Sequence, residues 1–142
     1  MNIQIINFGS LQYLQSVDLR YRILRKPLNL VFTQEFLLQD KYQHHIAAFD
    51  NKQLIGILLL KPIDNITFQM RQVAIDNNYQ GKGIGKQLVI FAENFAVQKH
   101  ISKIILHARQ NAVNFYLKLG YNIIGDEFIE VTIPHYYMEK IL

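Results

Sequence analysis

A glycine-rich turn that joins an aliphatic run to a helix-like stripe constrains the fold of this chain most. Residues 66–75 are typical of a strand, and apolar side chains recur beyond them at helical spacing, at Ile84, Leu88, Phe91, Ala92 and Phe95. Between them lies Gln80-Gly81-Lys82-Gly83-Ile84-Gly85. The first N–H groups of a helix lack helical acceptors, and glycine lets a ligand approach the main chain closely. The segment therefore predicts a phosphate site, to which Lys82 and Lys86 add positive charge.

Two other kinds of phosphate site fail on spacing. A Rossmann fingerprint requires glycine where Lys86 stands, and it opens a parallel unit near the chain start. A P-loop requires glycine at position 80 and a hydroxyl residue at position 87, where this chain has Gln80 and Gln87. From these residues alone, a glycine turn without a ligand remains the alternative.

The periodicity of the other segments predicts their order. Ile3 to Phe8 is strand-like, and Ser10 suits the cap of a helix that ends before Lys26-Pro27. We expect that helix to pack with one apolar face, made of Leu14, Val17, Tyr21 and Leu24. A second helical piece is expected over residues 33–41.

Strands and helices alternate in the rest of the chain. Three strands in an antiparallel meander are predicted over residues 46–50, 54–61 and 66–75, separated by Asn51-Lys52 and by residues 62–65. The helix after the glycines is followed by a strand over Lys103–Arg109, a short helix with Asn111 as N-cap and Gly120 just past its end, and strands over 121–124 and 134–141. We therefore expect one mixed α/β domain over residues 1–142.

Composition excludes several classes of protein. Of the 142 residues 50% are apolar and none is cysteine, so the chain can bury a core but has no disulfide framework. No signal-peptide pattern or membrane-length apolar run is found, which predicts a cytoplasmic protein without membrane association. The net charge is +4, but Lys and Arg are dispersed, so we expect no nucleic-acid partner; a small anionic ligand explains the charge equally well.

Four segments together resemble the GNAT superfamily. Met70–Ile75, then Gln80-x-x-Gly83-x-Gly85 and an amphipathic helix, resemble its acetyl-CoA motif. Residues 111–121, which read NAVNFYLKLGY, resemble its second signature. Residues 19–28 and 128–135 are similar to the ElaA-like and YjcF-like branch. The resemblance implies a mostly antiparallel mixed sheet of about seven strands, flanked by helices, whose fourth and fifth strands splay apart.

The resemblance also implies an activity and a cofactor site. It implies an N-acetyltransferase that moves acetyl from acetyl-CoA to a primary amine of a small molecule or peptide by direct attack. Tyr116 matches the general acid for the departing thiolate, and Asn111 matches a residue that contacts the cofactor arm. The main chain at Val73 and Ile75 would pair with the pantetheine arm. The diphosphate would lie on Gln80, Gly81, Lys82, Gly83, Ile84, Gly85 and Lys86.

Candidates for the acceptor side are less specific. Glu130 and His135 could accept a proton or orient the substrate, and Arg71 and Arg109 could meet an acidic group on it; each also fits an ordinary surface or strand role. His45 could face the same cleft. Adjacent residues of a strand point to opposite sides, so His44-His45 predicts no metal site.

One rival function and the assembly stay open. The segment 67–72 carries no acidic base, which leaves room for a non-catalytic acyl-CoA-binding or sensing module. A homodimer is also left open.

Overall fold

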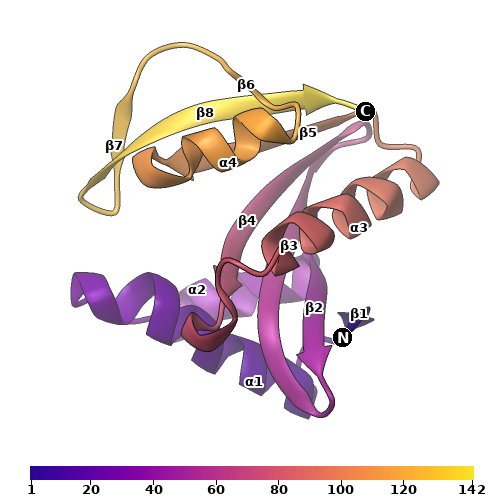
Figure 1. The fold of residues 1–142 in the computed structure, drawn as a ribbon, viewed down its shortest axis with the longest axis vertical. Helices are drawn as coiled ribbons and strands as arrows, with labels where there is room; N and C mark the ends of the chain where they lie inside the picture. Colours follow the sequence, from indigo (N-terminus) through magenta and orange to yellow (C-terminus); the bar gives the residue numbers. More distant parts are fainter.

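The computed structural model describes residues 1–142, which form one eight-stranded sheet with helices on both faces (Figure 1). The strands are β1 Asn2–Ile6, β2 His44–Asp50, β3 Gln53–Asp64, β4 Thr67–Ile75, β5 Lys103–Arg109, β6 Asn122–Ile123, β7 Phe128–Glu130 and β8 Ile133–Ile141. The α-helices are α1 Leu11–Arg20, α2 Gln34–Leu38, α3 Ile84–Gln98 and α4 Val113–Lys118. Shorter helical turns cover Tyr21–Arg25, Lys26–Leu28, Gln39–Tyr42, Asn77–Tyr79 and Gln110–Ala112. None of the helices combines the length and the apolar character that crossing a membrane requires.

The strand order is β1-β2-β3-β4-β5-β8-β6, and β7 pairs with β8. Only the contact between β4 and β5 is parallel, so the predicted antiparallel meander and the mixed sheet are confirmed. We expected about seven strands, and the additional one is β7. Its three residues are too few to show a period of two. A two-residue turn, Val131-Thr132, with φ of 44° and 69°, joins it to β8.

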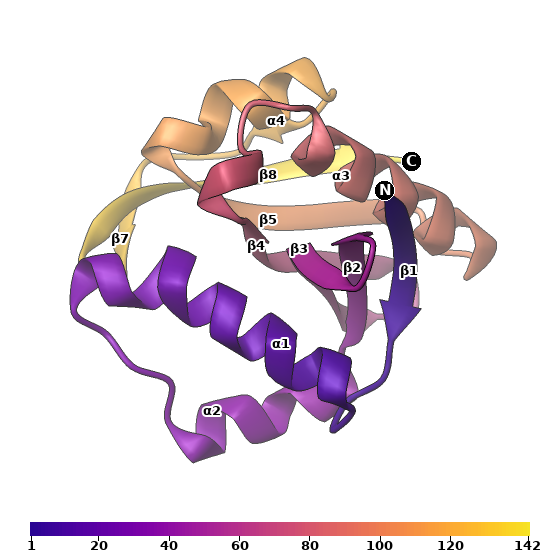
Figure 2. The ribbon, with the colours of Figure 1, turned by 60° about the horizontal axis from the view of Figure 1, so that its bottom comes forward.

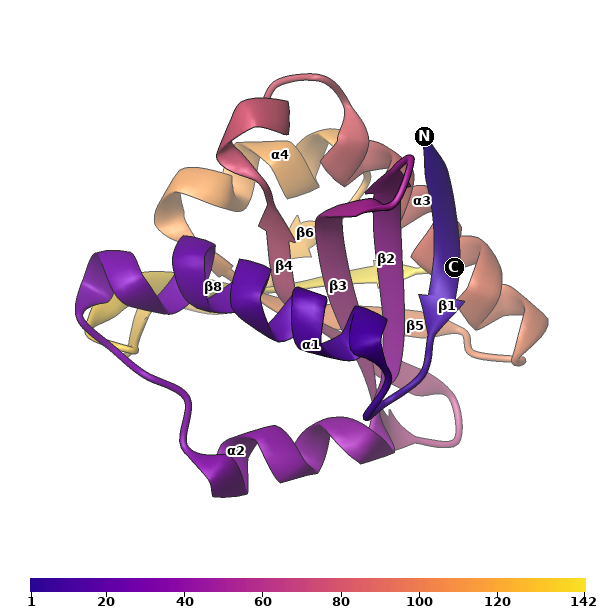
Figure 3. The ribbon, with the colours of Figure 1, turned by 90° about the horizontal axis from the view of Figure 1, so that it is seen from below.

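Helices cover the sheet on opposite faces (Figures 2 and 3), and each face buries its own apolar cluster. Helix α3 packs on β2, β3 and β4 with Leu88, Val89 and Ala92 fully buried. Helix α1 crosses the other face of β3 and β4, where Leu19 meets a smaller cluster that includes Leu59. The predicted stripe of α3 is therefore largely its core face, although Phe91 and Phe95 are only partly buried.

The predicted apolar face of the first helix was only partly right. Leu24, in the turn Tyr21–Arg25, packs half-buried against the smaller cluster, but α1 itself buries other residues than predicted. Leu14 is 60% exposed, whereas Tyr13, Ser16, Leu19 and Arg20 are buried. Apolar spacing points to the wrong side because Ser16 and Arg20 are polar residues that find hydrogen-bond partners inside the protein. The cap itself is as predicted, since the Tyr13 N–H donates to Ser10 Oγ at 3.1 Å.

Strands β4 and β5 part halfway along their length. They pair from Thr67 opposite Lys103 to Met70 opposite Leu106 and no further, and Figure 1 shows β4 turning away from β5 beyond that point. A bulge in β4 accompanies the divergence. Ile57 pairs with Ala74 and Leu59 with Arg71, so β4 has one extra residue between these pairs, and Gln72 there adopts φ of 55°. The expected splay of the fourth and fifth strands is confirmed.

Two other boundaries differ from the prediction. Asn111 is not an N-cap: it lies inside the turn Gln110–Ala112, and α4 begins after Ala112 without a side-chain cap. Strand β3 also continues through Pro62 to Asp64, which we expected to be a turn. Gly120 has φ of 94° just beyond α4, as predicted.

Candidate active site

A cavity of about 360 Å³ opens where β4 and β5 part. It brings together six of the residues that the sequence singled out, from four strands and a helix that are distant along the chain: Arg71, Val73, Arg109, Tyr116, Glu130 and His135. Its volume lies at the small end of the range of about 300–1,000 Å³ that is usual for sites of small molecules.

Tyr116 supplies a phenol to this cavity from α4. The residue is 7% exposed, and its ring packs edge-on against Phe115 and Tyr121 at centroid distances of 5.0 and 5.7 Å. No protein group hydrogen-bonds its hydroxyl, whereas the Tyr121 hydroxyl donates to Glu93 Oε2 at 2.9 Å. Burial raises the pKa of Tyr116 above its ordinary value, so the phenol holds its proton at neutral pH.

Glu130 enters the cavity from the end of β7, between two histidines. Its Oε1 lies 3.1 Å from His107 Nδ1 and its Oε2 lies 3.7 Å from His135 Nε2. The Glu130 side chain is 44% exposed and His135 only 4%. The other ring nitrogen of His135, Nδ1, lies 2.9 Å from the Ile133 carbonyl oxygen and so carries a proton. In neutral His135 that leaves Nε2 as the unprotonated nitrogen, beside the carboxylate.

Arg71 and Arg109 reach the cavity from the two parting strands. Arg71 Nη1 donates to Gln43 Oε1 at 3.4 Å, and Arg109 Nη2 donates to the Leu24 carbonyl at 3.1 Å. Burial lowers the pKa of both guanidiniums, although both remain charged.

The glycine turn ends in a helix start with free donors. Gly81 and Gly83 have φ of 77° and 81°, angles that are strained for other residues, and a Cβ added at either would meet open space. Gly83 is the N-cap of α3, and the first helical bond runs from the Gln87 N–H to the Gly83 carbonyl at 3.1 Å. The N–H groups of residues 84–86 have no acceptor in the chain, so they can bind an anion.

The side chains of this turn have different roles. Gln80 braces it, because Nε2 donates to the Ile75 carbonyl at 3.1 Å and to Asn77 Oδ1 at 3.2 Å. Ile84 is buried in the core, so only its main chain is available to a ligand. Lys82 and Lys86 are exposed. Gly85 lets α4 approach, since a Cβ there would lie 3.4 Å from Phe115.

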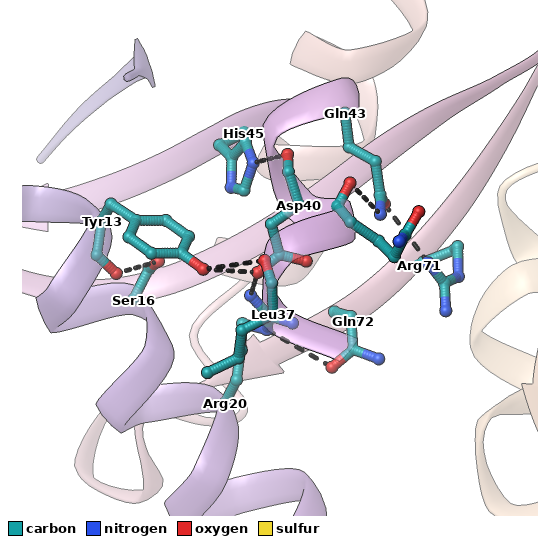
Figure 4. A network of polar contacts seen from close by, with 10 residues as sticks. Tyr13, Ser16, Arg20, Leu37, Asp40, Gln43, His45, Arg71 and Gln72 are labelled. Atoms are coloured by element: carbon teal, nitrogen blue, oxygen red, sulfur yellow. Dashed lines mark hydrogen bonds and ion pairs between the residues drawn. The ribbon is translucent and has the colours of Figure 1, made fainter. Parts of the chain in front are cut away.

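Besides the glycine turn at residues 80–86, three of the predicted site residues lie outside the cavity. Ile75 is further along β4 toward the glycine turn, and Asn111 is exposed on the turn before α4. His45 is 1% exposed beneath α1, where Nε2 donates to the Asp40 carbonyl at 2.7 Å (Figure 4). The structure does not bring His45 to the cleft. His44 faces the other side of β2, beside Phe68 and Phe95, as the alternation predicted.

Four charged or aromatic residues that line the cavity were not predicted from the sequence: Arg25, Phe36, Lys61 and His107. His107 had a detectable signal, because it lies two residues before Arg109 and therefore on the same face of β5. Arg25 and Phe36 had none, since a turn and a short helix bring them to the sheet from a distant part of the chain.

Comparison with known proteins shows the family to which this chain belongs. The family described as Acetyltransferase (GNAT) domain matches residues 26–142. Uncharacterized protein YyaT of Bacillus subtilis is 33% identical over 72% of this chain and 68% of its own length. Uncharacterized N-acetyltransferase YjcF of the same organism is 25% identical over 85% and 86%.

Two solved structures share the fold over nearly their whole length. Escherichia coli ElaA has a TM-score of 0.85 at 18% identity, covering 98% of both chains. A GNAT family acetyltransferase from Elizabethkingia anophelis, with acetyl-CoA bound, has a TM-score of 0.77 at 20% identity, covering 99% of this chain and 97% of its own. Acetyl-CoA is the acetyl donor of this family. The chain belongs to the GNAT family of acetyltransferases.

Proposed function

We propose that this protein is an N-acetyltransferase that moves the acetyl group of acetyl-CoA to a primary amine of a small molecule or peptide. One observation carries the proposal. Tyr116 lines the cavity that opens where β4 and β5 part, and its hydroxyl has no protein partner. It supports direct attack, in which the amine nitrogen bonds to the acetyl carbon, the carbon–sulfur bond breaks and Tyr116 protonates the departing thiolate.

The donor would lie between the glycine turn and the parted strands. Its diphosphate would bind the three free N–H groups at the start of α3, near Lys82 and Lys86. The pantetheine arm would pair with the main chain of β4 between Val73 and Ile75, which β5 leaves unpaired. A main-chain N–H near Val73 would stabilise the negative charge on the thioester oxygen.

The acceptor must lose a proton to react. An alkyl amine has a pKa near 10.4, so presenting it neutral at pH 7 costs about 4–5 kcal/mol. We assign the proton acceptor to Glu130 and His135, whose carboxylate and Nε2 are 3.7 Å apart. Between them they offer a negative charge that attracts the ammonium group and an unprotonated nitrogen that can take its proton.

Titration calorimetry with acetyl-CoA and with S-acetylpantetheine, which lacks the diphosphate, tests the donor site. We expect acetyl-CoA to bind more tightly and Gly83→Ala to reduce that difference, because alanine disfavours the left-handed angle. Gly9→Ala is the matched control, since Gly9 has φ of 78° and equally open surroundings far from the site. Both variants lose a similar stability, but only the first loses donor affinity.

Release of free thiol with a panel of amines tests the reaction. Turnover that depends on the amine supports the acetyltransferase. Binding of acetyl-CoA without turnover for any amine would instead favour an acyl-CoA-binding or sensing module. No heat with acetyl-CoA would exclude both functions.

A further inference from the structure

The cavity gathers positive charge that the protein does not neutralise. The chain contains five arginines. Arg20 and Arg22 have carboxylate partners, whereas Arg25, Arg71 and Arg109 line the cavity and none of these three has a carboxylate oxygen within 4.0 Å. The exposed Lys61 stands on the same cavity. One carboxylate, Glu130, lies among these four cations, and its Oε1 is 3.1 Å from His107 Nδ1.

Each of the three guanidiniums is held in place by neutral groups. Arg71 bonds to the Gln43 amide and Arg109 to a main-chain carbonyl. Arg25 lies over the rings of Phe32 and Phe36 at 4.8 and 4.9 Å, and Arg71 lies 5.8 Å from the Phe36 ring. These contacts orient the cations without cancelling their charge. The arginines are thus preorganised for an anion that the chain itself does not supply.

The charges also repel one another. Burial lowers the pKa of Arg25, and the nearby Arg20, Arg109 and Arg71 lower it further. Like charges that converge in a partly buried cavity destabilise the protein unless a ligand neutralises them. The donor is not that ligand, because its diphosphate site at residues 80–86 lies outside this cavity.

We propose that the acceptor amine carries an oxyanion, a carboxylate or a phosphate, which Arg71, Arg109 and Arg25 bind while Glu130 receives the amino group. This inference rests on the proposed acetyltransferase function. Guanidinium groups match both oxyanions because their parallel N–H donors fit two oxygens at once. The substrate class is therefore small amino acids or aminoalkyl phosphates, with the charge and the amine at opposite ends.

Three amines of equal chain length test the proposal: one ending in a carboxylate, one in a phosphate and one in a neutral carboxamide. With acetyl-CoA saturating, we expect kcat/KM for the better anion to exceed that for the carboxamide about 10-fold or more. The preferred anion identifies the oxyanion. Equal kcat/KM for all three amines overturns the proposal.

Variants locate the preference. Arg71→Gln and Arg109→Gln should each reduce the ratio of kcat/KM for the anionic amine to kcat/KM for the carboxamide about 10-fold or more. Lys52→Gln removes a charge from the exposed turn between β2 and β3, so it is the matched control and should keep the preference. A preference that survives both arginine variants overturns the assignment.

Calorimetry separates this inference from the function on which it rests. The same amines are titrated into the protein with CoA present, so affinity is measured without transfer. Tighter binding of the anionic amines that Arg71→Gln abolishes supports the inference even where no amine is acetylated. Acetylation of amines without any anion preference in affinity or rate leaves the function standing and rejects the inference.

Discussion

Two regions of this protein contain the same kinds of side chain, but one region pairs its arginine with a carboxylate and the other leaves its arginines without a carboxylate partner. Beneath α1, Arg20 Nη1 lies 2.8 Å from Asp40 Oδ2, and the Tyr13 hydroxyl donates to that same oxygen at 2.7 Å (Figure 4). His45 Nε2 donates to the Asp40 carbonyl. We call Tyr13, Arg20, Asp40 and His45 the α1 network. The cavity also has arginines, a tyrosine, two histidines and a carboxylate. However, no carboxylate oxygen lies within 4.0 Å of its guanidiniums, and the Tyr116 hydroxyl has no hydrogen-bond partner in the protein.

The difference separates structure from function. A buried charge is costly unless the protein pairs it, and the pairing of Arg20 with Asp40 joins α1 to the turn Gln39–Tyr42. Groups that remain unpaired at a cavity are typical of sites where a ligand completes the set. The regions meet at one point, because Arg20 Nε donates to Gln72 Oε1 at 3.3 Å, on the bulge beside Val73. The α1 network therefore supports the bulge that shapes the cavity.

Removing the carboxylate of the α1 network should have the largest effect. Asp40→Asn leaves the charge of Arg20 fully buried without an anion, and we expect the free energy of unfolding to fall by about 3–5 kcal/mol in urea denaturation. The double variant Arg20→Met, Asp40→Asn removes both charges and should recover part of the loss. A loss below about 1 kcal/mol for Asp40→Asn would show that the pair is not structural.

The two tyrosines sharpen the comparison. Tyr116→Phe should lower kcat about 100-fold with acetyl-CoA affinity and stability nearly unchanged, because its hydroxyl has no protein partner to lose. Tyr13→Phe should do the reverse and lower stability by about 1.5–3 kcal/mol, since it loses a bond to a carboxylate. Steady-state kinetics and urea denaturation of both variants measure this. Unchanged turnover in Tyr116→Phe would remove its role as general acid.

Acidification should lower the free energy of unfolding through the α1 network, by less than the substitutions above. Burial lowers the pKa of His45 below 6.5, partly offset by its bond to the Asp40 carbonyl, and Nδ1 is buried without a partner. The unfolded chain therefore binds the extra proton first. The stability that neutral His45 contributes is complete above pH 6.5 and is lost as pH falls through the lower pKa of the folded protein, with a slope of at most about 1.4 kcal/mol per pH unit.

His45→Gln isolates that proton. Glutamine keeps a donor for the Asp40 carbonyl but does not titrate, so the fall in unfolding free energy between pH 7.5 and 5.5 should become shallower. Part of the slope should remain, because burial also lowers the pKa of His44. An identical slope in the variant and the parent would mean that His45 does not sense pH.

Most of the elements could be predicted because their signals are local. The cap of Ser10, the meander, the stripe of α3 and the left-handed Gly120 each depend on a few neighbouring residues. The buried face of α1 could not be predicted, because Arg20 can be buried only where it pairs with Asp40, twenty residues away. Strand β7 exists only because β8 lies beside it.

The candidate site divides in the same way. The sequence alone determined that a helix with free N–H groups begins at the glycine turn. The free N–H groups follow from the geometry of any helix start, and the glycines leave them accessible because they lack side chains. Only the tertiary structure decided that Arg25 and Phe36 join Arg71, Arg109 and Tyr116, and that His45 does not. The physical reason is that charge complementarity and burial depend on which groups lie close in space. Here those groups meet at the cavity that opens where β4 and β5 part.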